Sequence, residues 1–172
     1  MAMMLGMSIS TFTTVHVAIS LVAIAAGLIV LFAMLRRRNP PGWTGLFLAM
    51  TLLTTLTGFL FPISALTPAL IVGVISLVLL IAAILARYAF ATHGLWRPVY
   101  IVTAVAALYL NVFVLVVQSF QKIAVLQPLA PTQSEPPFLV AQVIVLALFV
   151  GAGVFALIRF RPAAPQPAPI GA

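Results

Sequence analysis

The sequence predicts an all-α integral membrane protein, a bundle of five transmembrane helices with its N-terminus outside and its C-terminus in the cytoplasm. Eight Lys or Arg residues and one acidic residue are the only charged side chains among 172 residues. The long charge-free runs are Met1–Leu35, Asn39–Ala86, Pro98–Gln121 and Pro136–Ile158. A helix of about 20 apolar residues crosses the ~30 Å hydrocarbon core of a bilayer, so each run is long enough to span it. A soluble domain needs a far more charged surface.

The first helix is expected over residues 9–35, with Ser8 or Ser10 as its N-cap. Three arginines follow it, and Asn39-Pro40-Pro41-Gly42 cannot continue a helix. The apolar stretch is longer than the core of a signal peptide and no basic segment precedes it. We therefore expect this helix to be retained.

The second and third helices share one charge-free run. That run, Asn39–Ala86, has 48 residues and as a single helix would be ~72 Å long, more than twice the hydrocarbon thickness. The chain must therefore fold back, and the segment between Pro62 and Pro68 is the place with helix-breaking residues. The predicted helices cover residues 43–61 and 68–90.

The fourth and fifth helices are expected over residues 98–125 and 138–160. A turn at Ala91–Pro98 precedes the fourth, and a polar connection at Gln127–Pro137 precedes the fifth. Residues 1–161 then form a single bundle, and the Pro/Ala-rich residues 162–172 form a disordered cytoplasmic tail. A four-span alternative, with the second and third helices misassigned, would divide the arginines between the two sides.

The orientation follows from the excess of basic residues that cytoplasmic loops carry. With five spans, Lys122 and Glu135 fall on one side and all seven arginines on the other. Those arginines are Arg36, Arg37, Arg38, Arg87, Arg97, Arg159 and Arg161. The side with the arginines is therefore predicted to be cytoplasmic.

Composition excludes several classes of function. There is no cysteine, so no disulfide or thiolate metal site is expected. A single Glu and no Asp leave no carboxylate pair or catalytic triad, and no catalytic or metal residue is predicted. Nucleic acid is not an expected partner, because the positive charge of +7 lies at the ends of apolar runs. Four methionines among the first seven residues are either a soft Cu(I) ligand set or ordinary apolar residues.

Polar residues inside the predicted helices are the candidates for a binding site, since polar groups in a membrane usually face the bundle or a pathway. His16 lies on a stripe of small residues in the first helix, and helical spacing places Asn111, Gln118 and Lys122 on one face of the fourth. We expect these groups to converge at the outer end of the bundle. The candidate ligand-binding residues are His16, Asn111, Gln118, Gln121, Lys122, Glu135 and Gln142.

The alternative for these residues is interhelical hydrogen bonding, which also explains Asn, Gln and a neutral His in lipid. The hydroxyl-rich faces around Thr54 and Thr55 and around Ser76 are expected to be packing surfaces. Glu135 and Lys122 are the acid and the base expected outside, and they are able to pair across the loop.

Three functions fit these features. The first is an accessory subunit or small binding module with a polar site on its outer face, whose partners are the lipid bilayer and either another membrane protein or a second copy of itself. The second is a redox protein that uses His16 toward a quinone or haem; a haem held by two histidines is disfavoured because His93 is expected on the opposite side. The third is a small transporter, which lacks an acidic group in its membrane interior.

The stretch Leu129–Phe138, which contains APTQSEPPF, together with His16 early in the first helix, resembles a group of small uncharacterised bacterial inner-membrane proteins. The similarity covers residues 15–162 and implies a multi-pass helical fold in the bacterial inner (plasma) membrane. His16 and the small-residue helix after it also resemble cytochrome b561-like membrane proteins. That pattern requires paired histidines within the membrane, which this chain lacks.

Overall fold

The computed structural model describes residues 3–4, 6–61 and 68–160 and is dominated by five long helices. They are α1 (Ile9–Leu35), α2 (Pro41–Phe59), α3 (Pro68–Ile84), α4 (Trp96–Lys122) and α5 (Pro136–Arg159). A π-helical turn, η1 (Leu85–Ala89), extends α3, and a 3-10 turn, η2 (Gln127–Leu129), lies between α4 and α5. All five are long and apolar enough to cross a membrane. The prediction of an all-α membrane bundle with five spans is confirmed.

Several helix boundaries differ from the predicted ones by a few residues, and α2 also ends two residues early, at Phe59. The helices α2 and α5 begin at Pro41 and Pro136, two residues earlier than expected, and α4 begins at Trp96. Proline fits the first helical turn, because a backbone N–H at that position would have no partner within the helix. Pro41 and Pro136 are therefore the first residues of their helices and do not merely precede them. The fourth helix ends at Lys122, because Ile123 is extended. The predicted tail, residues 162–172, lies outside the described residues.

A short antiparallel ribbon precedes the first helix and was not predicted. Strands β1 (Met3–Met4) and β2 (Met7–Ser8) pair with Met4 opposite Met7. Gly6, with φ +78°, supplies the turn that an L side chain would resist. Ser8 then caps α1, since its hydroxyl oxygen accepts a hydrogen bond from the Thr11 amide at 3.1 Å. Ser8 is one of the two residues predicted as the N-cap.

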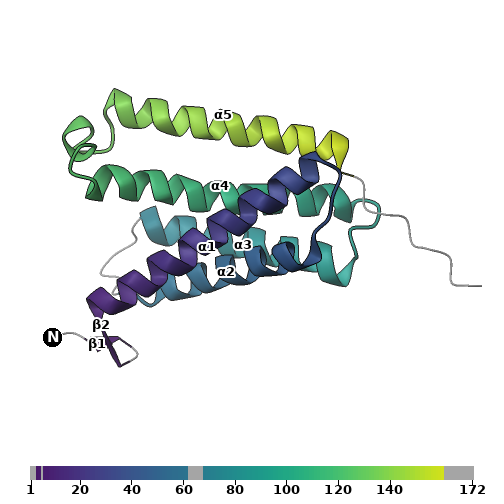
Figure 1. Ribbon diagram of the computed structural model, residues 1–172, viewed down its shortest axis with the longest axis horizontal. Helices are drawn as coiled ribbons and strands as arrows, with labels where there is room; N and C mark the ends of the chain where they lie inside the picture. Colours follow the sequence, from purple (N-terminus) through teal and green to yellow (C-terminus); the bar gives the residue numbers. More distant parts are fainter. Residues whose placement is uncertain (1–2, 5, 62–67, 161–172) are drawn as a thin grey trace, which may run out of the picture.

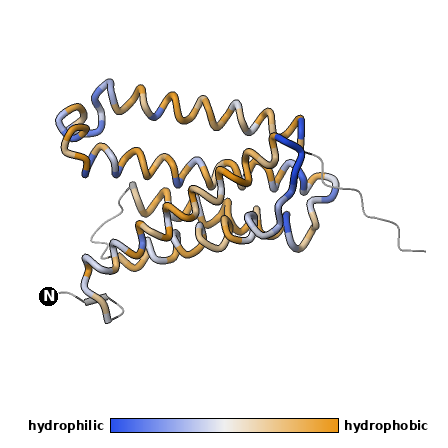
Figure 2. The backbone as a smooth tube through the Cα atoms, viewed as in Figure 1, coloured by the Kyte–Doolittle hydropathy of each residue, from blue (hydrophilic) through white to orange (hydrophobic). Residues whose placement is uncertain are grey.

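The helices run back and forth along the long axis of the molecule, so polar residues gather at its two ends (Figures 1 and 2). We call one the arginine end; it holds Arg36, Arg37, Arg38, Arg87, Arg97 and Arg159, at the α1–α2 and α3–α4 turns and the end of α5. We call the other the loop end; it holds the start of α1 and the α4–α5 connection, with Lys122 and Glu135. Arg161 lies outside the described residues.

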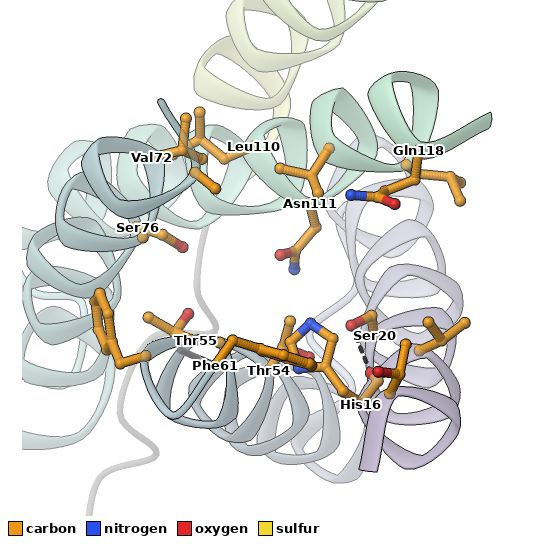
Figure 3. Close-up of a pocket in the computed structure, with 18 of the residues that line it drawn as sticks. His16, Ser20, Thr54, Thr55, Phe61, Val72, Ser76, Leu110, Asn111 and Gln118 are labelled. Carbon is orange, nitrogen blue, oxygen red and sulfur yellow. Dashed lines mark hydrogen bonds between the residues drawn. The ribbon is translucent and has the colours of Figure 1, made fainter. Parts of the chain in front are cut away.

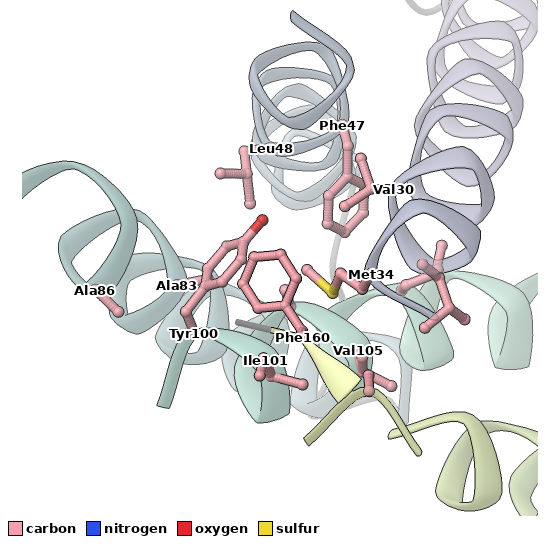
Figure 4. Packing of buried hydrophobic residues seen from close by; sticks show 14 of the residues in the cluster. Val30, Met34, Phe47, Leu48, Ala83, Ala86, Tyr100, Ile101, Val105 and Phe160 are labelled. Atoms are coloured by element: carbon pink, nitrogen blue, oxygen red, sulfur yellow. The ribbon is translucent and has the colours of Figure 1, made fainter. Parts of the chain in front are cut away.

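The apolar core is concentrated toward the arginine end, where α1 lies against α5 (Figure 1). Figure 4 shows the Phe160 ring beside Tyr100 and Met34, with the Tyr100 and Phe160 ring centroids 6.3 Å apart. Phe47 packs nearby against Gly27, whose lack of a side chain admits it. This end of the bundle is therefore closely packed, whereas the N-terminal part of α1 lies away from α5.

Arg97 joins the first turn of α4 to the last turn of α5. Its Nε donates to the carbonyl of Phe160 and its Nη2 to the carbonyl of Leu157. The last carbonyls of a helix have no partner within it, and a cation there also interacts favourably with the helix dipole. The guanidinium therefore caps α5 from the neighbouring helix.

The connection at the loop end is organised by Glu135. Its carboxylate accepts from the Thr132 amide at 3.1 Å, the Thr132 hydroxyl at 2.9 Å and the Ser134 amide at 3.1 Å. Gln133 donates to the Val117 carbonyl of α4 at 3.2 Å. The partners of Glu135 are thus its own loop neighbours and not Lys122, with which we expected it to be able to pair.

We expect the order of this loop to depend on the ionisation of Glu135. Desolvation raises the pKa of its carboxyl, but the hydrogen bonds from Thr132 and Ser134 outweigh that effect and hold the pKa below its ordinary value of 4.5. Because the pKa is lower in the folded loop than in an unfolded chain, the stabilisation is present at neutral pH and is lost as the pH falls through the folded-state pKa.

The Thr132 amide resonance should therefore titrate with a midpoint below 4.5, and Thr132→Val, which removes one donor, should move that midpoint upward. Midpoints of 4.5 or above in the wild type would contradict this account of the loop.

Candidate functional site: a polar cavity toward the loop end

A cavity of about 570 Å³ lies between α1, α2, α3 and α4, toward the loop end (Figure 3). Most of its lining is apolar, and among the described residues nine polar side chains interrupt that lining. They are Thr13, His16, Ser20, Thr54, Thr55, Ser76, Asn111, Gln118 and Lys122. Its volume is in the range of pockets that hold small ligands, ~300–1,000 Å³.

His16 is held in one orientation by α2. Its Nδ1 lies 2.8 Å from the Thr57 hydroxyl oxygen, and that hydroxyl already donates its single proton within α2, to the Leu53 carbonyl at 2.6 Å. Thr57 can therefore only accept from the ring, which assigns the proton of a neutral imidazole to Nδ1. The Phe61 ring packs edge-on against the imidazole, with centroids 5.3 Å apart.

This tautomer leaves Nε2 of His16 as an acceptor. No hydrogen bond within the described part of the chain uses Nε2, and Figure 3 shows a ring nitrogen directed into the cavity, toward the Asn111 amide. Asn111 is itself only lightly held, donating from Nδ2 to the Thr51 hydroxyl at 3.3 Å. Two helices thus present polar atoms to the same space.

Three further polar atoms of the lining are buried without a hydrogen-bond partner among the described residues. They are Thr54 Oγ1, Ser76 Oγ and Gln118 Oε1. Ser76 is only 5% exposed, and Figure 3 shows its hydroxyl directed into the cavity. An unsatisfied buried polar group costs about 1–3 kcal/mol. A molecule in the cavity that forms hydrogen bonds with these atoms removes that cost, which favours its binding.

The structure brings together four of the seven predicted ligand-binding residues. His16, Asn111, Gln118 and Lys122 line the cavity, and Lys122 is exposed. The other three, Gln121, Glu135 and Gln142, lie outside its lining.

Each of those three has a different environment. Gln121 is exposed, and Glu135 is bonded within its loop. Gln142 is buried on α5 and donates to the Phe113 carbonyl of α4 at 3.3 Å. The interhelical alternative therefore describes Gln142, and His16 and Asn111 also each bond to a neighbouring helix, through Thr57 and Thr51 of α2.

Sequence reasoning did not place Thr54, Thr55 and Ser76 in the candidate site. Their hydroxyls were interpreted as packing surfaces, and in Thr55 the hydroxyl does bond along its own helix, to the Thr51 carbonyl at 2.9 Å. Ser76 and Thr54 make no such bond. The available signal was that the hydroxyl-rich faces of the second and third helices lie at the same depth as His16 and Asn111.

The charges of the lining limit what it can hold. The cavity has no acidic residue and one lysine, so it suits a neutral or anionic polar group better than a cation. No group of three or more His, Cys, Asp or Glu side chains able to hold a metal ion occurs in the described part of the chain. His93, the other histidine, lies in the α3–α4 turn at the arginine end, so it cannot complete a haem site with His16.

The fold and the spans define the chain as a multi-pass membrane protein with a polar cavity inside its helical bundle. In comparisons with known proteins, the chain matches no family model, no curated protein sequence and no solved structure.

Proposed function

We propose that this protein is a non-enzymatic binding module, or an accessory subunit, of a bacterial inner membrane, and that it binds a small amphipathic molecule in the cavity around His16. The observation that carries the proposal is the set of buried, unpartnered polar atoms of Thr54, Ser76 and Gln118 in an otherwise apolar cavity. Ligand sites combine an apolar lining with a few polar groups that orient the ligand.

The lining specifies the hydrogen-bonding character of the ligand. Gln118 Oε1 and the Nε2 of a neutral His16 accept hydrogen bonds, whereas the hydroxyls of Thr54 and Ser76 can also donate them. A ligand that satisfies both kinds carries a hydroxyl or amide together with a carbonyl or a similar acceptor. The apolar remainder of the cavity then takes its hydrocarbon part.

A quinone or quinol is the second candidate, and the orientation of His16 favours it. The Thr57 hydroxyl holds the imidazole so that the unprotonated nitrogen faces the cavity, where it can accept the hydroxyl proton of a quinol. The hydroxyls of Thr54 and Ser76, which line the same cavity, can donate to quinone carbonyls. A quinone in the organic extract of the purified protein supports this candidate; its absence, with another ligand present, rules it out.

The binding site can be tested with a matched pair of glutamines. Gln118→Leu removes a polar group of the cavity, whereas Gln142→Leu makes the same change on a buried glutamine outside it. We expect the compound extracted from protein purified in mild detergent to fall about tenfold in Gln118→Leu, as expected for the loss of one ~1.4 kcal/mol interaction. Asn111→Leu should have a similar effect.

In Gln142→Leu the bound compound should stay at the wild-type level. Two outcomes contradict the proposal: a wild-type extract with no compound above that of an unrelated membrane protein, or equal losses in both glutamine variants.

The proposed orientation, with the loop end outside, has its own test. The chain has no cysteine, so one introduced cysteine reports one position without background. A membrane-impermeant maleimide should label Ser134→Cys in intact cells, because Ser134 is exposed at the loop end. His93→Cys, exposed at the arginine end, should be labelled only after permeabilisation. The reverse pattern would show the opposite orientation.

A further inference from the structure

A second hollow, of about 510 Å³, lies on the surface at the arginine end of α1, away from the cavity around His16. Its lining is Ile29, Phe32, Ala33, Arg36, Arg38 and Pro40. We call this surface the α1 groove. None of its residues lines the His16 cavity, so the two sites are separate.

The apolar part of the α1 groove is one face of a single helix. Ile29, Phe32 and Ala33 recur at the spacing that places helical side chains one above the other. Ile29 is 39% and Phe32 58% exposed, so both present apolar surface that the chain itself does not cover. Ala33 lies between these larger side chains and Arg36, and because its side chain is small, the space above it stays unfilled and forms the hollow.

The turn after α1 brings the second guanidinium to the same face. Arg37 has φ +58°, and the chain reverses there so that the amides of Arg36 and Arg38 both donate to the Ala33 carbonyl, at 3.0 and 2.8 Å. Glycine is the residue that this left-handed position at a helix end usually holds. The turn therefore places Arg36 and Arg38 in the groove lining, while Arg37 is outside it.

The two arginines have no counter-ion within the described chain. The one acidic residue, Glu135, lies at the other end of the molecule, and all three arginines of the turn are exposed. A guanidinium matches the geometry of phosphate oxygens and can bond to two of them at once. Basic side chains at the end of a transmembrane helix attract anionic lipids.

We propose that the α1 groove binds an anionic glycerophospholipid of the surrounding leaflet. The phosphate lies between Arg36 and Arg38, and one acyl chain runs along Ile29 and Phe32 over the hollow at Ala33. This places the headgroup level with the helix end and the hydrocarbon along its lipid-facing side, as in the bilayer itself. A zwitterionic lipid offers the same chains but adds an ammonium beside the arginines, so it binds less tightly.

The experiment compares lipids on the intact protein by native mass spectrometry after delipidation. Phosphatidylglycerol should be retained and phosphatidylcholine should not. Arg36→Gln and Arg38→Gln should each weaken phosphatidylglycerol retention about tenfold, the factor for the loss of one charge-assisted hydrogen bond to the phosphate, ~1.4 kcal/mol. The matched control is Arg37→Gln, which removes the same charge from a side chain outside the groove and should leave retention close to wild type.

Two further arms separate the contributions of the groove. Ala33→Phe fills the hollow without changing any charge and should lower lipid retention, with an unchanged circular dichroism spectrum as evidence of folding. Glycerol 3-phosphate tests whether a phosphate without acyl chains suffices, and it should not compete with the lipid at equal concentration.

Equal retention of the two lipids, or equal losses in Arg37→Gln and Arg36→Gln, would overturn the proposal. Equal competition by glycerol 3-phosphate would also overturn it, because the groove would then be a site for a small anion.

Discussion

Replacement of Arg97 by methionine is expected to lower the free energy of unfolding by about 3 kcal/mol or more, since its two hydrogen bonds from a charged group contribute ~1.5–3 kcal/mol each. Methionine keeps most of the length of the side chain but cannot donate to the carbonyls of Phe160 and Leu157. The last turn of α5 then has unpaired carbonyls, and α4 loses its polar link to the end of α5.

The matched control is Arg159→Met, the same change in the last turn of α5. Arg159 is exposed and lies over the Phe155 ring at 4.5 Å, a cation–π contact worth ~0.5–1 kcal/mol at an exposed site. Unfolding in detergent, followed by circular dichroism, measures both variants. Equal stability of the two variants would show that the Arg97 bonds do not hold the helix ends together.

Substitution of Gly27 is expected to have the second large effect. A Cβ on Gly27 would lie 2.5 Å from Cδ1 of Leu108 and 2.8 Å from two ring atoms of Phe47. Both neighbours are only 1% exposed, so neither side chain can move without displacing others in the core. Gly27→Ala should therefore destabilise the protein by about 1–3 kcal/mol through overpacking, and Gly27→Val should fail to fold.

Gly151 offers the control for that experiment. It lies inside α5, and an added Cβ would meet no atom within 4 Å, so Gly151→Ala should be neutral or gain up to ~1 kcal/mol from the better helix propensity of alanine. Thermal unfolding of the two alanine variants side by side measures the difference. If Gly27→Ala were as stable as Gly151→Ala, the close approach of α1 to Phe47 and Leu108 would not exist in the folded protein.

The helix count was predictable from charge and proline alone. A bilayer imposes a length of about 20 residues on each apolar helix, so the 48-residue run had to become two helices, as α2 and α3 are. The helix starts were less predictable. Pro41 and Pro136 serve both as helix breakers and as good first helical residues, and the structure places them inside the helices.

The candidate site was predicted only in part. Helical spacing places Asn111 and Gln118 on one face of α4, and both line the cavity with His16. Gln142 was predicted to belong to the same site, but α5 faces α4 from another side and Gln142 bonds there. The spacing of residues in the sequence shows which side chains share one face of a helix. Which neighbouring helix that face contacts depends on how the helices are rotated and how they cross.

The amino-acid sequence by itself determined that the chain spans a membrane, how many times it does so, and that the arginines gather at one end. Only the tertiary structure decided which polar side chains share a cavity, which of them bond to a neighbouring helix, and where Gly27 admits Phe47. The physical reason is the solvent. In lipid, an apolar residue is as well accommodated outside the bundle as inside it, so hydrophobic pattern does not mark the inward face. Close packing and hydrogen bonds between helices decide it instead.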